Sequence, residues 1–274
     1  LALLQAAGGT ALDDIDRLRG DAGLTRLLGR QVPSAGTLGR FLRSATGSMV
    51  RGLTRANHAL IHAILRRRPL RTLTIDVDAT LIESRKRGAR KTYKGFRGYD
   101  PLLAHIAQLG LVLTGVFREG NASPSSHAHA FLNRCLRLVR GAARKIRLRS
   151  DSAWYEARVL DRCHEAGVEF AVTADQDVAV RDVIRRIPEE AWRPLPARFG
   201  EECFWAETVH SLNPSRYAYR LIVLRQKARQ ADLFDGLWFH HAVITNIESH
   251  AAPAVLRWHR GRMGSENLLK ELKE

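Results

Sequence analysis

Two aspartates stand in an unusual place near the first quarter of the chain. The segment "LTIDVDATLIES" is apolar and β-branched, yet it contains Asp76 and Asp78 two positions apart. Residues i and i+2 of a strand point to the same face, so this spacing puts both carboxylates on one side. Charged side chains are costly in a buried strand unless a metal ion or a partner charge compensates them. The pair therefore predicts a site where carboxylates meet a cation.

Two further acids could join this site in a folded chain. Asp151 follows the strand-like segment "KIRLRS", and Glu266 lies in the C-terminal segment "MGSENLLKELKE". Side chains at the end of a strand reach a cleft in many α/β folds. Carboxylates that a fold brings together repel one another, and a divalent cation with oxygen ligands relieves that repulsion. Two such ions can activate a hydroxyl and stabilise the leaving oxygen of a phosphodiester.

Each acid also has a structural explanation when it is considered alone. An aspartate at a strand end often caps a turn, and Glu266 can pair with Lys270 along a helix. The joint placement of the acids on a basic chain is what favours phosphodiester chemistry.

The composition favours a polyanionic partner. The chain has 44 Lys and Arg residues against 28 Asp and Glu, which gives a formal charge of +16 and a pI near 10.7. Nucleic acid is the partner that this charge predicts. We find no apolar span of roughly 20 residues and no basic amphipathic helix, so we expect no membrane contact.

The cysteines point to a reducing compartment. Cys135, Cys163 and Cys203 lie far apart without a CxxC spacing, which argues against a disulfide framework or a structural zinc site. With a hydrophobic content of 45% the chain can bury a sizeable core. These features predict a globular protein of the cytoplasm.

The elements that would position the acids follow from the periodicity of the sequence. Residues 1–70 have apolar residues at three-to-four spacing, which predicts a helical region that either binds DNA or packs on the next domain. Over residues 71–176 the pattern is three strands, a helix, a strand, a helix and a strand, which is typical of an α/β fold. These residues would form the first part of the catalytic core.

After residue 176 the helical signal weakens. Residues 177–247 read as strands separated by turns, so we predict a β-rich insertion that includes the last strand. Residues 248–274 read as a C-terminal helix that carries Glu266. The chain begins without Met and stops inside a helical pattern, so we expect the natural chain to be longer.

The acidic segments and the C-terminus resemble a known family. The chain is similar to bacterial insertion-sequence transposases of the DDE type, in the group with a Tyr-Arg-Glu-Lys signature around the last acid. The segment "HRGRMGSENLLKELK" has His259, Arg262, Glu266 and Lys273 at the spacing of that signature, with His259 in place of Tyr. The segments "DVDAT" and "LRSDSAWY" resemble the first and second acidic motifs.

The resemblance implies a fold and a chemistry. It implies an α/β fold with a ribonuclease-H-like mixed sheet, flanking helices, a β-rich insertion before the last helix and an N-terminal helical region. It implies that Asp78, Asp151 and Glu266 hold two Mg²⁺ ions, or Mn²⁺ in their place, with Asp76 as the alternative to Asp78. The expected activity is cleavage of DNA at transposon ends and transfer of a 3′ hydroxyl into target DNA. The expected partner is double-stranded DNA, bound by a homodimer at the bacterial nucleoid.

Two groups of residues are predicted to contact DNA. The resemblance implies phosphate contacts for His259, Arg262 and Lys273. A basic segment after the first strand has no acidic residue between Ser84 and Gly98, and it could clamp a DNA backbone or be merely solvated. Its predicted DNA-binding residues are Arg85, Lys86, Arg87, Arg90 and Lys91.

Two other functions remain open at the level of the sequence. A nuclease of the same fold would hydrolyse DNA without joining it. A non-catalytic remnant would bind DNA without taking up a specific metal ion.

Overall fold

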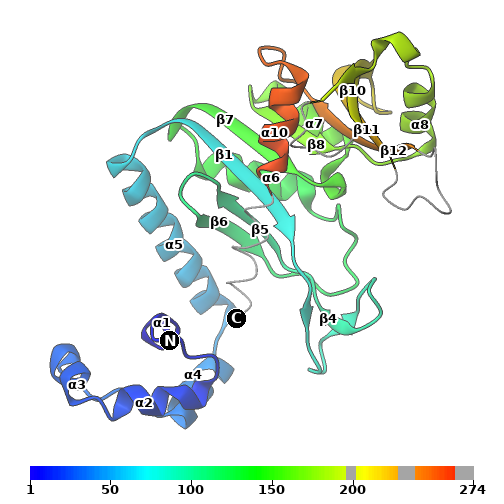
Figure 1. Ribbon diagram of the computed structural model, residues 1–274. Helices are drawn as coiled ribbons and strands as arrows, with labels where there is room; N and C mark the ends of the chain where they lie inside the picture. Colours follow the sequence, from blue (N-terminus) through cyan, green and yellow to red (C-terminus); the bar gives the residue numbers. More distant parts are fainter. Residues whose placement is uncertain (196–201, 228–237, 263–274) are drawn as a thin grey trace. The chain divides into compact units, whose positions relative to one another are not determined.

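The structure is a computed structural model that describes residues 1–195, 202–227 and 238–262 (Figure 1). The chain divides into two compact units, and the second begins at His58. Helix α5 (Gly47–Arg67) crosses this division. The division therefore lies inside a helix, whereas the sequence analysis set the boundary at residue 70.

The first unit is helical, as the periodicity predicts. Its core contains four buried side chains, Leu4, Ile15, Val32 and Leu38. The hydroxyl of Ser34 caps the fourth helix by accepting a hydrogen bond from the backbone N–H of Thr37 at 3.3 Å. Before α5 its helices are α1 (Ala2–Ala6), α2 (Ile15–Arg19), α3 (Ala22–Leu28) and α4 (Ala35–Arg43), with a short 3₁₀ turn, η1 (Leu12–Asp14).

The second unit is built on a nine-stranded mixed sheet. The strand order is β6-β5-β1-β7-β8-β12-β11-β10-β9. Strands β1, β7 and β8 run parallel to one another, and the other neighbours are antiparallel. The strands are β1 (Leu70–Ala79), β5 (Leu102–Ile106), β6 (Leu111–Val116), β7 (Ala143–Ser150), β8 (Glu169–Thr173), β9 (Arg193–Pro194), β10 (Cys203–His210), β11 (Tyr219–Lys227) and β12 (Trp238–Thr245).

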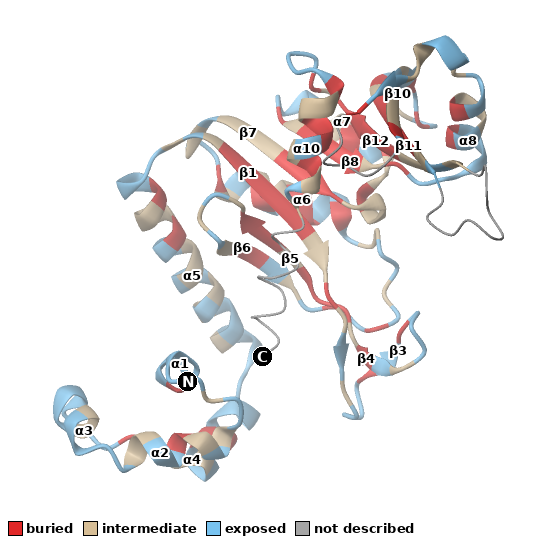
Figure 2. Ribbon diagram, viewed as in Figure 1, coloured by how far each residue is buried: buried red, intermediate tan, exposed pale blue. Residues whose placement is uncertain are grey.

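Helices cover both faces of this sheet (Figure 1). On one face Leu73, Ile75 and Val77 of β1 pack in a core with buried residues of α5, α6, α7 and α8. On the other face α10 packs on strands β8, β11 and β12. The red central strands in Figure 2 show that the sheet is the buried layer. The helices are α6 (Ala128–Leu138), α7 (Ala157–Glu165), α8 (Val178–Arg185) and α10 (Ala252–Arg260), with 3₁₀ turns η2 (Ser152–Trp154) and η3 (Glu189–Ala191).

The predicted order of strands and helices over residues 71–176 is confirmed. Strands β1, β5 and β6 are followed by α6, β7, α7 and β8 in that sequence. A small three-stranded sheet interrupts the order between β1 and β5. It consists of β2 (Ile82–Glu83), β3 (Arg90–Lys91) and β4 (Arg97–Tyr99), and it carries the basic segment.

The region after residue 176 differs from the prediction in one element. Residues Val178–Arg185 form helix α8, which was not predicted within the β-rich insertion. The carboxylate of Asp177 caps this helix by accepting a hydrogen bond from the N–H of Val180 at 2.8 Å. The helix is short and rich in valine, so its periodic signal is weak. The expected strands follow it, and they extend the main sheet because β12 pairs with β8.

Within residues 248–274, which were predicted to form a C-terminal helix, the structure describes α10 over Ala252–Arg260. Residues 263–274, which include Glu266 and Lys273, lie outside the described part of the chain. Among the described residues, no helix is both long and apolar enough to cross a membrane.

Candidate active site

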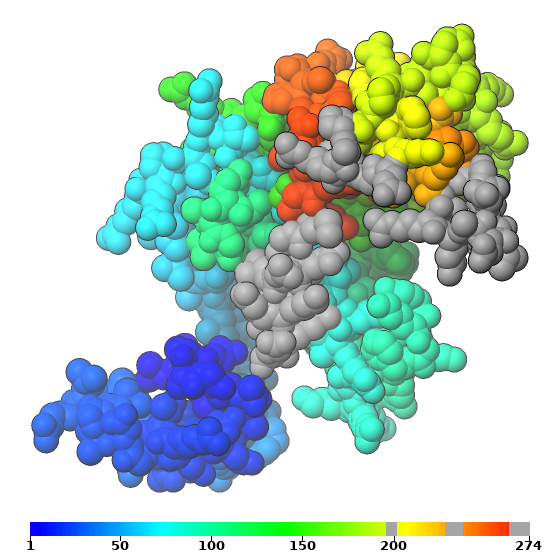
Figure 3. All heavy atoms as spheres, in the orientation of Figure 1, coloured from blue at the N-terminus to red at the C-terminus, as the bar shows by residue number. Residues whose placement is uncertain are grey.

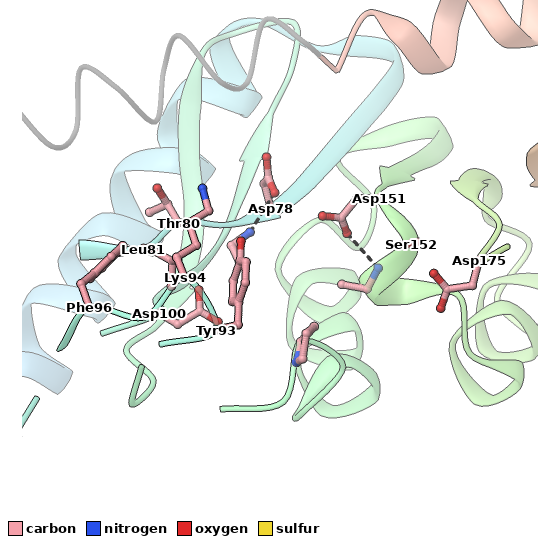
Figure 4. A pocket seen from close by; sticks show the side chains of 13 residues that line it. Asp78, Thr80, Leu81, Tyr93, Lys94, Phe96, Asp100, Asp151, Ser152 and Asp175 are labelled. Carbon is pink, nitrogen blue, oxygen red and sulfur yellow. Dashed lines mark hydrogen bonds between the residues drawn. The ribbon is translucent and has the colours of Figure 1, made fainter. Parts of the chain in front are cut away.

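Asp78 and Asp151 come from the ends of two neighbouring parallel strands. Asp76 of β1 lies opposite Arg149 of β7, so Asp78 and Asp151 follow at matching positions two residues further along. Both side chains line one cavity of about 740 Å³ (Figure 4). This is the convergence that the sequence predicts for the first and second acids.

Two more aspartates line the same cavity. Asp100 precedes β5, and Asp175 follows β8, so that Asp151 lies between Asp78 and Asp175 in the view of Figure 4. The sequence analysis did not select either residue as a site residue. Asp175 follows a predicted strand in the same way as Asp151, and that signal could have found it.

Asp78 is held by two contacts on its side chain. Its Oδ1 accepts a hydrogen bond from the N–H of Ala79 at 3.0 Å. Its Oδ2 forms an ion pair with Nη1 of Arg262 at 3.1 Å. Arg262 lies two residues after the end of α10, so the C-terminal signature segment reaches the first acid. The guanidinium of Arg262 therefore balances the charge of Asp78.

Asp76 has different surroundings from Asp78. Only 1% of Asp76 is exposed, and its two carboxylate oxygens accept hydrogen bonds from Nε and Nη2 of Arg149 at 2.6 Å each. His105 of β5 lies 3.4 Å from Oδ2 on the other side. Burial alone would raise the pKa of Asp76, but His105 and Arg149 outweigh it and hold the pKa below its ordinary value. The charge of Asp76 is therefore balanced inside the protein by Arg149.

Arg149 joins Asp76 to α10. Its guanidinium stacks on the ring of Trp258 at 5.3 Å and donates to the backbone carbonyl of the same residue. The same carbonyl also accepts a hydrogen bond from the N–H of Gly261 at 3.1 Å, so Arg149 donates to a second lone pair at the end of the helix. The ion pair therefore fixes the end of α10 from which Arg262 departs.

His259 is buried rather than exposed to a ligand. Only 5% of it is exposed, and its Nε2 lies 3.2 Å from the backbone oxygen of Ser150. Burial lowers the pKa of His259 to about 4, so the ring is neutral at pH 7 and donates to this oxygen. The sequence analysis expected a phosphate contact for His259. Its position favours a different role, which is to hold α10 against the end of β7.

Asp100 is paired inside the protein. Its Oδ2 accepts a hydrogen bond from Nη2 of Arg118 at 2.7 Å. Burial raises the pKa of Asp100, and the charge of Asp151 adds to the rise while Arg118 opposes it. Asp100 thus has an internal partner for its charge, although it lines the cavity with Asp151.

The family follows from the whole sequence. The family model for the transposase DDE domain group 1 matches residues 1–274. The chain belongs to this family. No curated protein matches it.

A solved transposase structure agrees with this DDE domain in fold. The piggyBac transposase synaptic complex with hairpin DNA matches with a TM-score of 0.53 and 12% sequence identity. The match covers 96% of this chain and 54% of that chain, so the DDE domain spans about half of the piggyBac chain. The Mos1 mariner paired end complex with Mn matches with a TM-score of 0.28 and 10% identity over 68% of this chain and 63% of that chain, which is too low to inform the fold. The fold is the expected ribonuclease-H-like mixed sheet with flanking helices.

The donor set of the DDE domain suits a hard divalent cation. Carboxylate oxygens are the ligands that Mg²⁺ and Mn²⁺ prefer, and Asp78 and Asp151 supply them to one cavity. Within the described ranges, no group of three or more His, Cys, Asp or Glu residues has the arrangement of a complete metal site. The third predicted ligand, Glu266, lies in the part of the chain that is not described.

The basic segment of the DDE domain lies next to this cavity. Tyr93, Lys94 and Phe96, between β3 and β4, line the cavity together with Asp78 (Figure 4). The side chain of Arg90 lies 3.6 Å from Glu119. The five residues of the basic segment that were predicted to contact DNA are exposed: Arg85, Lys86, Arg87, Arg90 and Lys91.

Proposed function

We propose that this chain is the transposase of a bacterial insertion sequence, which cuts DNA at the ends of its element and joins a 3′ hydroxyl to target DNA. Membership of the transposase DDE domain group 1 supports this reaction. The observation that carries the proposal is the convergence of Asp78 and Asp151 on one cavity beside an exposed basic segment. The Tyr-Arg-Glu-Lys signature, with His259 in the first place, is part of the proposal.

The carboxylates would hold the metal. Asp78, Asp151 and Glu266 would bind two Mg²⁺ ions, for which Mn²⁺ can substitute, and Asp76 would support Asp78 from the neighbouring position. Bound ions of this kind lower the pKa of an attacking hydroxyl or water and stabilise the leaving oxygen of the phosphodiester. The oxygen donors of the cavity fit this requirement.

The cationic side chains would hold the DNA. Arg262 and Lys273 would contact phosphates next to the scissile bond, and guanidinium groups bind such oxygens with two hydrogen bonds. Arg262 already reaches the cavity through its ion pair with Asp78. Lys94 would contact the strand that enters the cavity, since it is part of the lining.

The DNA partners would be the two ends of the element and the target duplex. Two ends call for two active sites, so we propose a homodimer in the DNA complex. The net charge of +16 supports a polyanionic partner. We place the protein in the bacterial cytoplasm, at the nucleoid.

Product analysis tests the reaction. The purified chain is incubated with Mg²⁺ or Mn²⁺ and two DNAs: a plasmid that carries its coding sequence with the natural flanking DNA, and a second plasmid as the target. Joined molecules with the element in the target support the transposase. Cut ends without joined molecules would support a nuclease of the same fold instead.

Calorimetric titration with Mn²⁺ tests the metal site without DNA. We expect specific uptake by the wild-type chain and its loss in Asp151→Asn, because the amide lacks the anionic charge that attracts the cation. Duplex binding without saturable Mn²⁺ uptake would indicate a non-catalytic remnant.

A further inference from the structure

Six arginines gather at the end of the sheet where β1 and β7 begin. They come from two separate segments, 66–71 and 140–144, which the pairing of Leu70 with Ala143 brings side by side. All six side chains are exposed, and none has an ion-pair partner among the described residues. We call this set the rear patch; it consists of Arg66, Arg67, Arg68, Arg71, Arg140 and Arg144.

Two members of the rear patch line a cavity. The cavity has a volume of about 600 Å³, and both Arg71 and Arg144 line it. These two arginines occupy matching positions on neighbouring strands, so their side chains leave the sheet on the same face. Gly141, with a φ of +73°, makes the turn that brings the second segment to the cavity.

The rear patch is remote from the candidate active site. Asp78 lies near the end of β1, whereas Arg68 and Arg71 flank its beginning. Asp78 is seven residues from Arg71 and ten from Arg68, so at about 3.3 Å per residue the two places are roughly 23 to 33 Å apart along the strand. In Figure 1 the start of β1 adjoins the end of α5, and its other end points to the small sheet around β4. The rear patch therefore cannot be part of the same pocket.

We propose that the rear patch binds the phosphate backbone of a duplex DNA segment other than the one held at the active site. Arginine forks match phosphate oxygens in geometry, and six of them without acidic partners attract a polyanion strongly. Neither segment, "RRRPLR" nor "RGAAR", contains an aromatic residue on which an unpaired base could stack. This absence favours duplex DNA over a single strand.

The inference rests on the proposed function only in taking DNA as the partner. A second duplex site would let one protein molecule hold DNA on both ends of its sheet. The contacts would be to the phosphate backbone and would carry no sequence preference, because the phosphates are the same at every position of a duplex.

The salt dependence of duplex binding tests the rear patch. A variant with Arg68→Gln, Arg71→Gln and Arg144→Gln should lower the slope of log K against log salt by up to about 0.9 for each lost phosphate contact. The matched control removes three charges from α8 through Arg181→Gln, Arg185→Gln and Arg186→Gln, and it should change the slope by less. An unchanged slope in the first variant, or an equal fall in both, would overturn the proposal.

Photo-crosslinking tests the location directly. The native cysteines at 135, 163 and 203 are all buried, so a thiol-reactive crosslinker should label only a new surface cysteine. With Arg144→Cys we expect crosslinks to a labelled 30-base-pair duplex of arbitrary sequence, and with Arg186→Cys we expect few. Equal crosslinking at both positions, or none at residue 144, would contradict the proposal.

The outcomes separate this inference from the proposed function. If the wild-type chain neither cuts nor joins DNA but residue 144 still crosslinks to the duplex, the rear patch stands and the transposase proposal fails. If joining proceeds and residue 144 gives no crosslink, the transposase proposal stands and the rear-patch proposal fails. Cleavage by the triple rear-patch variant at saturating DNA should equal that of the wild type, since no rear-patch residue lines the active-site cavity.

Discussion

Arg149 and Asp76 form a two-pronged ion pair across neighbouring strands, and Arg149 also donates to the carbonyl of Trp258 on α10. The side chain of Arg149 thus connects β1 to α10, the helix in which the signature segment begins. Asp76 lies two residues from the predicted metal ligand Asp78, yet its charge is already balanced by an internal partner. The two aspartates of the opening motif should therefore respond differently to the same substitution.

Asp76→Asn should destabilise the fold. Removing one member of a buried ion pair leaves the other charge uncompensated, and this typically costs about 3 to 5 kcal/mol. The free energy of unfolding in urea measures the effect. Asp175→Asn is the matched control, because Asp175 is exposed and its loss should change stability by less than about 0.5 kcal/mol. Equal stability of the two variants would show that the ion pair is not a structural brace.

Asp78→Asn should abolish DNA cleavage and leave duplex binding intact. The amide keeps the shape of the side chain but loses the charge that attracts the cation. Cleavage of a labelled plasmid in Mn²⁺ and binding by fluorescence anisotropy are the two measurements. Asp76→Asn should retain activity reduced about 10- to 100-fold, as is typical of a group that orients a ligand. Robust cutting by Asp78→Asn beside an inactive Asp76→Asn would reverse the two roles.

Gly261→Ala should loosen the end of α10. An added Cβ would lie 2.6 Å from Nη1 of Arg149 and 3.1 Å from the carbonyl oxygen of Trp258. Arg149 cannot easily move aside because Asp76 holds it, so we expect a loss of about 1 to 3 kcal/mol in the free energy of unfolding. Gly52→Ala is the control. Its Cβ would meet no atom within 4 Å, and alanine in a helix should stabilise by up to about 1 kcal/mol.

Stability should fall in mild acid, in part because of His259. Its pKa is about 4 in the folded chain against an ordinary value of 6.5. Between these values the unfolded chain binds a proton that the folded chain does not, so stability falls as the pH drops from 6.5 towards 4. His259→Gln should remove up to about 2 kcal/mol of the stability difference between pH 7 and pH 5. Urea unfolding at both pH values measures this.

Part of the stability difference between pH 7 and pH 5 should remain in His259→Gln. Burial also lowers the pKa of His210, His240 and His241, so their contributions have the same sign. A wild-type chain that is equally stable at pH 5 and pH 7 would contradict the buried, neutral state of His259.

The basic segment near the cavity should contribute to the salt dependence of binding. Arg85→Gln, Lys86→Gln and Arg87→Gln together should lower the slope of log K against log salt by up to about 3 on duplex DNA. The control variant on α8 should show a smaller change. An unchanged slope would mean that the segment is only a solvated surface.

The sequence was sufficient to predict those helices and strands whose patterns are local. The apolar alternation of β1 and the three-to-four spacing of α6 and α7 predict their types and order. The cap of α4 is local as well, because the hydroxyl of Ser34 acts within three residues of its own position. Helix α8 was missed since its eight residues are too few to establish a helical period against their β-branched content.

The details of the site depend on contacts between distant segments. The spacing of Asp76 and Asp78 predicts a shared face, but only the register of β1 against β7 puts Arg149 opposite Asp76. No local pattern indicates that His259 would be buried against Ser150, because this depends on how α10 docks. The strand-end rule that predicted Asp151 also applies to Asp175, which lines the same cavity.

The pairing of β12 with β8 also affects how the chain folds while it is being synthesised. Strand β8 is the last element of the core pattern to leave the ribosome, and its outer edge stays open until β10, β11 and β12 have been synthesised. An open, apolar strand edge can form backbone hydrogen bonds with a strand of another chain. Val172 and Ala171 at this edge are fully buried in the finished fold, so their early exposure would be a hazard. A nascent or shortened chain that ends before β12 should therefore be aggregation-prone and depend on chaperones, while the complete sheet closes that edge.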